Sequence, residues 1–435
     1  MEKAETHQFP EDLIFNVLAW LPAKSLMRFK TVCKSWQALI LDPYFVESHH
    51  TISRPRRPDS SYLVFLMATA QQGVVYHSVS SFNGKPQWGI FPAKPDGVFS
   101  NQLPLHTFKA ANDGYDGYGM RCTNIVNGLI CIWVSPFQFE LLNLTTREKV
   151  ALPRLETPNY RHARDFYPSY YLGFDPSKKQ YKVLFRGETG QYFIITFSNS
   201  TCMSWKKVES KPQCGLLAVA NTCVDGAIYW NVKDSRAVQY FEVGEEKFKV
   251  LHIPDRAGED DEVHQTEIGG KFTLAFFTRC YIGSGTFGSD QITLWRLINR
   301  NEGVWVKSLV ELASSLIDGQ YLRFCGSTNT GNMLLRTSEP SPGNPQHTRY
   351  KLIFCDLGEK KKHETVQLIF EDNFPLWKPI SVVKCVSITH HVENILPLNL
   401  QKRMTKEPRI QRSTFYNGLS RVLGSKVFNW LSTAL

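Results

Sequence analysis

The sequence predicts a multidomain α+β chain in which a small N-terminal module of three helices precedes a large all-β domain. In residues 9–48, apolar side chains recur at the spacing of one helical face. From residue 62, short apolar runs alternate with turns rich in Gly, Asn and Asp, which is typical of strands. The strands recur in units of roughly 50 residues, which favours a β-propeller, with a β-sandwich as the alternative.

The helical module has clear start and stop signals. Pro10 fits the first turn of a helix, and Glu11 and Asp12 favour the positive end of its dipole. Pro22 ends this helix and begins the next. Asp42, which a proline follows, is expected to cap a last short helix. The pattern therefore predicts three short helices and a fourth half-turn.

The module has more apolar side chains than three small helices can hide from water. A segment of about 40 residues is too short for a large core of its own. A partner protein that covers the excess explains this surplus, and so does packing on the chain's own β domain. On pattern alone the two explanations are equally good.

Each repeat of the β domain has two halves. The first is a tight turn with Gly before an apolar strand, at 127–131, 225–230, 269–274 and 331–335. The second is a strand, a polar turn and a strand, at 139–153, 192–208, 238–254, 292–309 and 350–368. With a poorer unit at 62–90, the pattern predicts about six units. A last strand near 380–388 is expected to pair with the first unit and close the ring.

These patterns divide the chain into four parts. We expect the helical module at 1–50, a linker at 51–61, the β domain at 62–400 and a basic tail at 401–435. The arginines of the linker fit a solvated connection or a nuclear-import signal. Apolar residues between Phe415 and Leu431 fall near one helical face, which predicts an amphipathic helix in the tail.

The net charge of +10 lies mostly in the tail. Residues 401–435 carry seven Lys or Arg and one acid, so the tail supplies +6 and the first 400 residues only +4. A nearly balanced body argues against a nucleic-acid-binding face. No apolar run is long enough to span a membrane, and the N-terminus does not look like a signal peptide. We therefore expect a cytoplasmic or nuclear protein.

The sequence holds no recognisable catalytic or metal-binding motif. Its ten cysteines are scattered without a CxxC pair, which fits buried thiols. Residues 283–288 spell GxGxxG, but a strand pattern follows them, so we expect a hairpin loop and no dinucleotide site. No cofactor is expected.

One loop has the composition of a binding site. Residues 154–167 combine arginines with aromatic side chains, and Arg154, Tyr160, Arg161 and Arg164 are the candidates for contacting a protein substrate. Guanidinium groups match acidic or phosphorylated segments. A solvated loop between repeats explains the same residues and is the favoured explanation.

Residues 9–48 resemble an F-box along their whole length. The resemblance lies in Pro10, the pairs Leu13-Ile14 and Leu21-Pro22, the runs 24–26 and 28–30, Val32-Cys33-Lys34-Ser35-Trp36, and Asp42-Pro43-Tyr44-Phe45. Phe9 departs from the family, which usually carries Leu there.

The F-box resemblance implies docking on a Skp-type adaptor of a cullin–RING ubiquitin ligase. The residues it implies for adaptor contact or for the module's own core are Pro10, Leu13, Ile14, Leu18, Leu21, Pro22, Leu26, Val32, Cys33 and Trp36. The sequence does not separate the two roles.

Residues 122–400 resemble the plant F-box-associated, kelch-like domain. The similar segments are 126–133, 142–153, 171–185, 224–231, 241–254, 268–277 and 294–309, in the same order and spacing. Together the resemblances imply a non-catalytic, substrate-recognising subunit of a Skp–cullin–F-box E3 ubiquitin ligase. A non-degradative scaffold is an alternative, as is a propeller-type carbohydrate binder or enzyme. The expected partners are the adaptor and an unidentified protein substrate; neither nucleic acid nor a membrane is expected.

Overall fold

The structure is a computed structural model that describes most of the helical module and of the β domain. The described residues are 11–53, 62–70, 87–93, 106–109 and 123–398, the last range without 136–137, 156–168, 188–189, 198–202, 213–221, 232–236, 254–261, 283–284, 313–322, 328–332, 342–343, 356, 358–362, 369–381 and 392. Pro10, most of the predicted linker and the basic tail lie outside them.

Four helices form the N-terminal module: α1 (Glu11–Ala19), α2 (Ala23–Phe29), α3 (Lys34–Leu41) and α4 (Pro43–Ser53). Asp42 caps α4 as predicted, because its Oδ1 accepts hydrogen bonds from Tyr44 N at 2.8 Å and Phe45 N at 3.2 Å. The predicted half-turn was too short, since α4 has 11 residues. No helix in the described part of the chain is long and apolar enough to cross a membrane.

The length of α4 comes from tertiary packing. Its C-terminal half is polar in sequence, but His49 is fully buried and its Nε2 donates a hydrogen bond to Leu21 O at 3.0 Å. Phe45 and Val46 are buried in the same core, and Phe15 of α1 lies 5.2 Å from Phe45 between ring centroids. A helix whose polar residues are buried in this way is not visible as an apolar period.

The described strands form six antiparallel sheets, which we call blades 1 to 6 in chain order. Blade 1 holds β23 (Val382–His391), β1 (Tyr62–Ala70), β2 (Gln87–Ala93) and β3 (His106–Lys109). Blade 2 holds β4 (Leu129–Ser135), β5 (Gln138–Asn143) and β6 (Lys149–Ala151). Blade 3 holds β7 (Ser169–Asp175), β8 (Gln180–Arg186), β9 (Tyr192–Phe197) and β10 (Lys206–Lys207).

The other three blades have four strands each. Blade 4 holds β11 (Thr222–Val224), β12 (Ala227–Asn231), β13 (Ala237–Glu242) and β14 (Lys247–His252). Blade 5 holds β15 (Glu262–Ile268), β16 (Lys271–Ile282), β17 (Gly285–Asn299) and β18 (Val304–Glu311). Blade 6 holds β19 (Arg323–Ser327), β20 (Met333–Ser341), β21 (Asn344–Cys355) and β22 (His363–Leu368).

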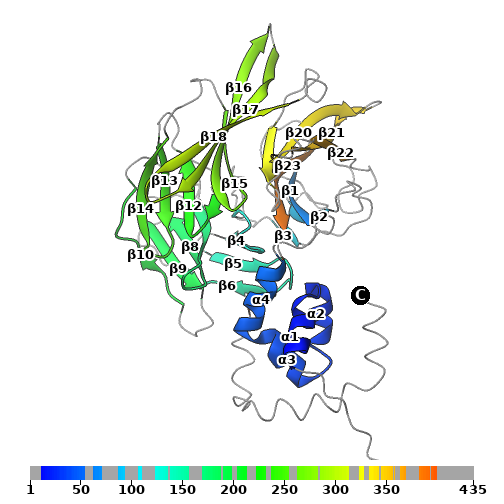
Figure 1. Ribbon diagram of the computed structural model, residues 1–435, viewed down its shortest axis with the longest axis vertical. Coiled ribbons are helices and arrows are strands. Elements are labelled where there is room, and N and C mark those ends of the chain that lie inside the picture. Colours follow the sequence, from blue (N-terminus) through cyan, green and yellow to red (C-terminus); the bar gives the residue numbers. More distant parts are fainter. Residues whose placement is uncertain are drawn as a thin grey trace, which may run out of the picture.

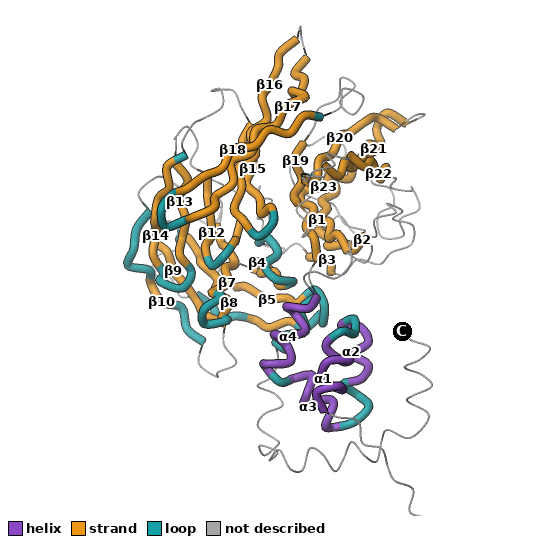
Figure 2. The backbone as a smooth tube through the Cα atoms, in the orientation of Figure 1, coloured by secondary structure: helices purple, strands orange, loops and turns teal. Residues whose placement is uncertain are grey.

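The blades form a propeller that is closed by its last strand. β23 pairs antiparallel with β1, for example Phe65 with Ile388, and supplies the inner strand of blade 1. β23 also lies against β19 of blade 6, so the last blade meets the first. This confirms the predicted closing strand and the propeller in place of the sandwich. Figures 1 and 2 show the sheets with the four helices beneath one side.

The predicted Gly turns at 225–226 and 269–270 join the inner strands of blades 4 and 5 to their neighbours, and the turn at 127–128 joins Val126, which bridges to Leu129, to β4. Backbone φ is positive at both central residues of three two-residue turns, Asn127-Gly128, Asp225-Gly226 and Gly269-Gly270. Such turns match the twist of antiparallel strands. The fourth predicted turn, at 331–332, lies outside the described residues. The predicted hairpin is confirmed, because β17 pairs with β16, but the loop predicted at 283–288 was too long, since 285–288 belong to β17.

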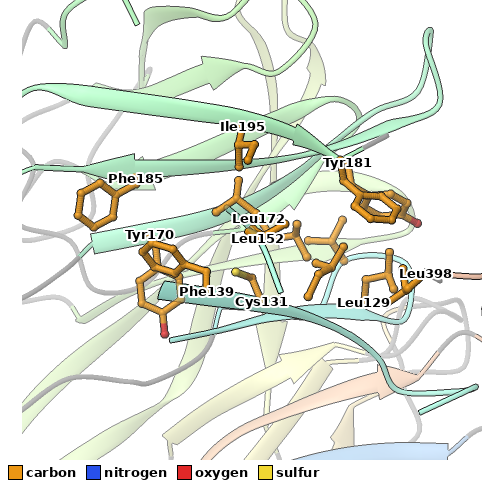
Figure 3. Packing of buried hydrophobic residues seen from close by; sticks show 14 of the residues in the cluster. Leu129, Cys131, Phe139, Leu152, Tyr170, Leu172, Tyr181, Phe185, Ile195 and Leu398 are labelled. Carbon is orange, nitrogen blue, oxygen red and sulfur yellow. The ribbon is translucent and has the colours of Figure 1, made fainter. Parts of the chain in front are cut away.

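Apolar side chains fill the space between neighbouring blades from blade 2 to blade 6. Between blades 2 and 3, residues of β4 and β5 meet residues of β7, β8 and β9, as Figure 3 shows. Phe139 stands 5.5 Å from Phe185 and 5.3 Å from Tyr170 between ring centroids. Leu398, from beyond the closing strand, is buried in this cluster. The core is thus a series of layers between blades, each needing both neighbours.

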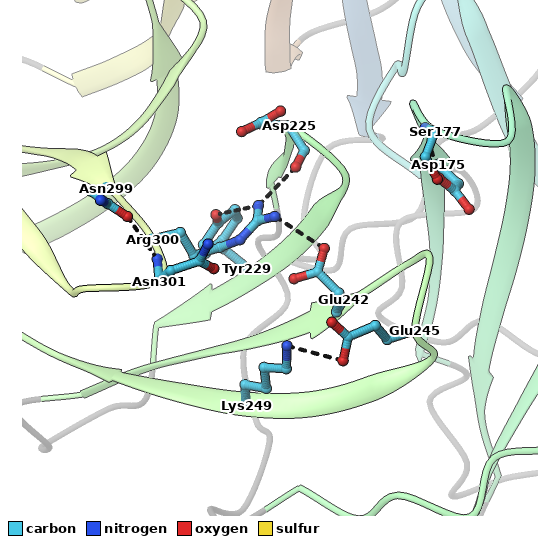
Figure 4. A network of polar contacts seen from close by, with 10 residues as sticks. All are labelled: Asp175, Ser177, Asp225, Tyr229, Glu242, Glu245, Lys249, Asn299, Arg300 and Asn301. Carbon is cyan, nitrogen blue, oxygen red and sulfur yellow. Dashed lines mark hydrogen bonds and ion pairs between the residues drawn. The ribbon is translucent and has the colours of Figure 1, made fainter.

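Blade 4 is tied to both neighbours by polar side chains. Arg300, in the β17–β18 turn of blade 5, donates to Asp225 O at 2.7 Å and pairs with Glu242 at 3.0 Å (Figure 4). From blade 3, Lys182 is almost fully buried and reaches Glu246 Oε1 and Val243 O, both at 2.8 Å. The β13–β14 turn is therefore held from both sides.

Replacing Glu246 by Gln should lower the free energy of unfolding by about 3 kcal/mol at neutral pH, because the buried Lys182 loses its counter-charge. Burial raises the pKa of Glu246, but hydrogen bonds from Lys182 and Lys206 outweigh it and keep the pKa below its ordinary value. The ionised Glu246 therefore stabilises the fold fully above the pKa of an unfolded Glu, near 4.3. This stabilisation is lost as the pH falls through the lower pKa of the folded state. Denaturant titrations at several pH values measure both effects.

Glu245 is the matched control for this substitution. It forms a mostly exposed ion pair with Lys249 at 3.1 Å, so Glu245→Gln should change stability by less than about 0.5 kcal/mol. Equal losses for the two variants would show that the cross-blade pair does not stabilise the propeller.

Candidate functional site: the exposed apolar face of the helical module

The structure separates the predicted adaptor-binding residues into two groups. Leu18, Leu21, Leu26 and Trp36 are buried in the core of the four helices, where Trp36 packs edge-on against Phe29 at 5.0 Å between centroids. These four residues hold the module together. They are not available to a partner while the helices stay packed.

The remaining predicted residues face outward to different degrees. Leu13 and Val32 are 47% and 48% exposed, and Pro22 is exposed as well. Ile14 and Cys33 are half-buried. Pro10 lies outside the described residues. Leu13, Pro22 and Val32 are therefore the predicted residues that a partner reaches first.

Two more side chains of the module, both aromatic, are exposed, although the sequence analysis did not count them among the adaptor-binding candidates. Trp20 is 64% exposed and Tyr44 is 69% exposed. Trp20 N donates to Asn16 O, so Trp20 continues the helical path and lies two turns from Leu13 on the same side. The i, i+7 spacing of Trp20 from Leu13 was the available signal. We call Leu13, Trp20, Pro22, Val32 and Tyr44 the apolar face.

Part of the module's apolar surplus is covered by the chain itself. The segment 393–398, which follows the closing strand β23, passes between the helices and blade 2; we call it the clip. Ile395 is buried in the helical core, and Glu393 Oε2 accepts a hydrogen bond from Ala23 N at 3.0 Å, at the start of α2. Packing on the chain's own β domain, one of the two explanations of the apolar surplus, therefore accounts for part of it.

Two buried asparagines fasten the clip to blade 2. Asn143 Nδ2 donates to the carbonyl oxygens of Asn394 and Leu396, both at 2.9 Å. Asn394 Nδ2 donates to Asn127 O at 2.7 Å and to Tyr181 Oη at 3.0 Å. Each amide thus satisfies backbone groups that burial would otherwise leave unpaired. The helices and the propeller are held by one continuous segment.

The clip ends in apolar contacts on the same blade. Leu398 is buried beside Leu129, as Figure 3 shows, and Leu398 N donates to Glu148 Oε2 at 2.7 Å. An exposed ion pair between Lys179 of blade 3 and Glu47 of α4 also links the propeller to the helices. This pair contributes little to stability because water screens it.

The predicted substrate-binding loop is only partly described. Arg154 is exposed, and the strand end before it is fixed by a hydrogen bond from Trp205 Nε1 to Pro153 O at 2.7 Å. Tyr160, Arg161 and Arg164 lie outside the described residues, so their role stays a prediction. In the described part of the chain, no group of His, Cys, Asp and Glu side chains is arranged to hold a metal ion.

Comparison with known proteins identifies both parts of the chain. The model of the F-box domain matches residues 7–48, and that of the F-box associated beta propeller domain matches residues 64–391. The chain is therefore an F-box protein. Within that class, it belongs to the family that carries an F-box associated beta propeller domain. The kelch-like character expected from the sequence is not supported by these matches.

The relatives are plant F-box proteins of similar length. F-box protein At4g19940 of Arabidopsis thaliana is 23% identical over 82% of this chain and 84% of its own. F-box protein At1g47340 of the same plant is 25% identical over 94% of this chain and 86% of its own. Among solved structures, the WD40 domain of SCAP from fission yeast covers 66% of this chain and 72% of its own at 8% identity, with a TM-score of 0.29. A likeness this weak carries no argument.

The F-box domain implies binding to a Skp-type adaptor.

Replacing Asn394 by Ala should lower the free energy of unfolding by about 2–3 kcal/mol, because Leu396 N, Asn127 O and Tyr181 Oη lose their buried partner. Amide hydrogen exchange in α2 should become faster, since Ala23 N loses its fixed acceptor on the neighbouring Glu393. Hydrogen exchange measured by mass spectrometry follows the stability of α2 and of the propeller in one experiment.

Asn299→Ala is the matched control, because Asn299 caps the β17–β18 turn through Asn301 N and does not bridge two parts of the chain. It should leave exchange in α2 unchanged. Unaltered exchange in the Asn394 variant would mean that the clip does not hold the helices.

Proposed function

We propose that this chain is the substrate-recruiting subunit of a Skp–cullin–F-box E3 ubiquitin ligase. The observation that carries the proposal is the apolar face of the F-box, which stays exposed even after the clip has covered part of the module. Five exposed apolar or aromatic residues on one small helical module are unfavourable for a monomer, and they suit a protein partner. The Skp-type adaptor is that partner.

The clip gives this arrangement a mechanical consequence. Because Ile395 belongs to the helical core and Leu398 to the core of blades 2 and 3, the adaptor-binding face and the propeller move as one body. A substrate held by the propeller then stays at a fixed distance from the adaptor. Proximity of this kind raises the local concentration of an acceptor lysine near the charged ubiquitin carrier.

In this proposal the chain binds and orients but catalyses nothing itself, and it acts in the cytoplasm, the nucleus or both. A scaffold that uses its F-box only for assembly is the main alternative. The two functions differ in what happens to the bound protein. A ligase subunit shortens the lifetime of its partner, whereas a scaffold leaves it unchanged.

Leu13→Ala and Val32→Ala should each weaken binding of a co-expressed Skp-type adaptor by about tenfold, because each removes an exposed apolar side chain that only the adaptor buries. The free energy of unfolding should change by no more than about 1 kcal/mol, since both side chains are half in water already. Co-purification and calorimetry on the full chain measure the binding.

Two controls make this test specific. Leu309→Ala removes a side chain of similar exposure, 49%, from blade 5 and should leave adaptor binding intact. Leu21→Ala removes a buried side chain and should cost about 2–5 kcal/mol of stability. Full adaptor binding by a Leu13→Ala, Val32→Ala double variant would refute the docking proposal.

The same double variant separates ligase from scaffold. It is preferable to deletion of residues 1–50, because deletion would uncover Ile395 and disturb the clip. A substrate should be retained by the variant but become long-lived in cells. If the half-lives of retained proteins do not change, the scaffold function is correct.

A further inference from the structure

Exposed apolar side chains gather at two places in the described part of the chain. One is the F-box, and the other is the outer hairpin of blade 5, with Ile298, Val304, Val306 and Leu309. The second group lies on β17 and β18, away from the four helices (Figure 1). It therefore needs an explanation of its own.

β18 differs from the other outer strands that the structure describes. It has eight residues, whereas β14 and β22 have six, β3 four, β6 three and β10 two. No strand among the described residues pairs with its outer edge, because the sheet order of blade 5 ends at β18. A long outer strand presents a row of unpaired backbone N–H and C=O groups.

The first three residues of β18 lack the charged side chains that usually protect an edge strand; Lys307 and Glu311 follow further along the strand. β10 is formed by two exposed lysines, and β14 begins with an exposed lysine, Lys247. Charges of this kind discourage pairing with another chain. β18 instead exposes Val304 and Val306 on one face, with Trp305 buried between them. Val306 is 51% exposed.

The one cation on this strand lies on the opposite face. Lys307 follows Val306, and its Nζ stands 5.6 Å from the centroid of the Trp295 ring on the paired strand. The ring holds the ammonium group against the sheet, where it is exposed and has no ion pair among the described residues. An incoming strand would meet two valines on one face and a positive charge on the other.

We infer that β18 is the docking site for an extended segment of the substrate protein, which adds to blade 5 as a fifth strand. Backbone hydrogen bonds along β18 supply the attachment, and side chains supply the selection. The segment carries apolar side chains opposite Val304 and Val306 and a carboxylate opposite Lys307. This inference rests on the proposed function, because it names where and how a substrate is held.

The probe that tests this site is a synthetic peptide that alternates Val and Thr and carries one Glu, added to the full chain in complex with the adaptor. Fluorescence anisotropy measures the binding of this peptide. Bound peptide should slow amide hydrogen exchange at residues 304–311. Val306→Lys should lower the affinity for the peptide by about fivefold or more, since one apolar cross-strand pair is replaced by an unpaired charge. His252→Lys, on the exposed end of β14, is the matched control and should have no effect.

A charge exchange makes the test specific. The Lys307→Glu variant should bind the Glu-containing peptide more weakly than the unaltered chain does. It should bind well a second peptide in which Lys replaces that Glu. A peptide with Pro at its centre should not bind, because it loses a backbone donor. Binding that ignores these changes, or protection on another blade, would overturn the inference.

Two further outcomes are distinguishable. If the full chain doubles its mass with concentration and Val306→Lys prevents it, β18 pairs with a second copy and the substrate inference fails. If the chain does not retain the adaptor, the proposed function fails whatever the peptide does. Loss of peptide binding with adaptor binding intact in Val306→Lys supports both.

Discussion

The packing of the helices against the propeller depends on two buried amides. Asn143 and Asn394 bind the clip to blade 2 through hydrogen bonds between side chain and backbone, and both side chains are almost completely buried. Unpaired amides at such depth cost several kcal/mol, so the clip has one favourable path. That path brings Ile395 into the helical core and Leu398 into the core of blades 2 and 3. The orientation of the F-box follows from it.

Much of the architecture was predictable because it is local or periodic. Turns such as Asp225-Gly226 require positive φ at both positions, and Gly and Asp or Asn signal that directly. The closing strand followed from the need to pair an edge, and β23 lies where the sequence placed it. The F-box was recognised from its succession of residue types, which no other pattern in the chain repeats.

The parts that escaped prediction depend on contacts distant in sequence. Leu13 and Leu21 fit the same helical stripe, yet Leu13 is half exposed and Leu21 is buried. Helical spacing alone does not show which residues of a stripe other elements cover. His49 is buried through a bond to Leu21 O, 28 residues away, so the true length of α4 was hidden. The clip has no period at all, and its asparagines resemble ordinary loop residues. Arg300 likewise gave no sign that it ties blade 5 to blade 4.

The position of the clip also sets an order of events during synthesis. The F-box leaves the ribosome first, but the strand that closes the ring and the isoleucine that completes the helical core are encoded more than 300 residues later. Until then, blade 1 has an unpaired inner edge and the F-box has an incomplete core. A message cut short before residue 382 therefore yields a chain whose ring and helical core are both incomplete, which exposes apolar surface and unpaired strand edges.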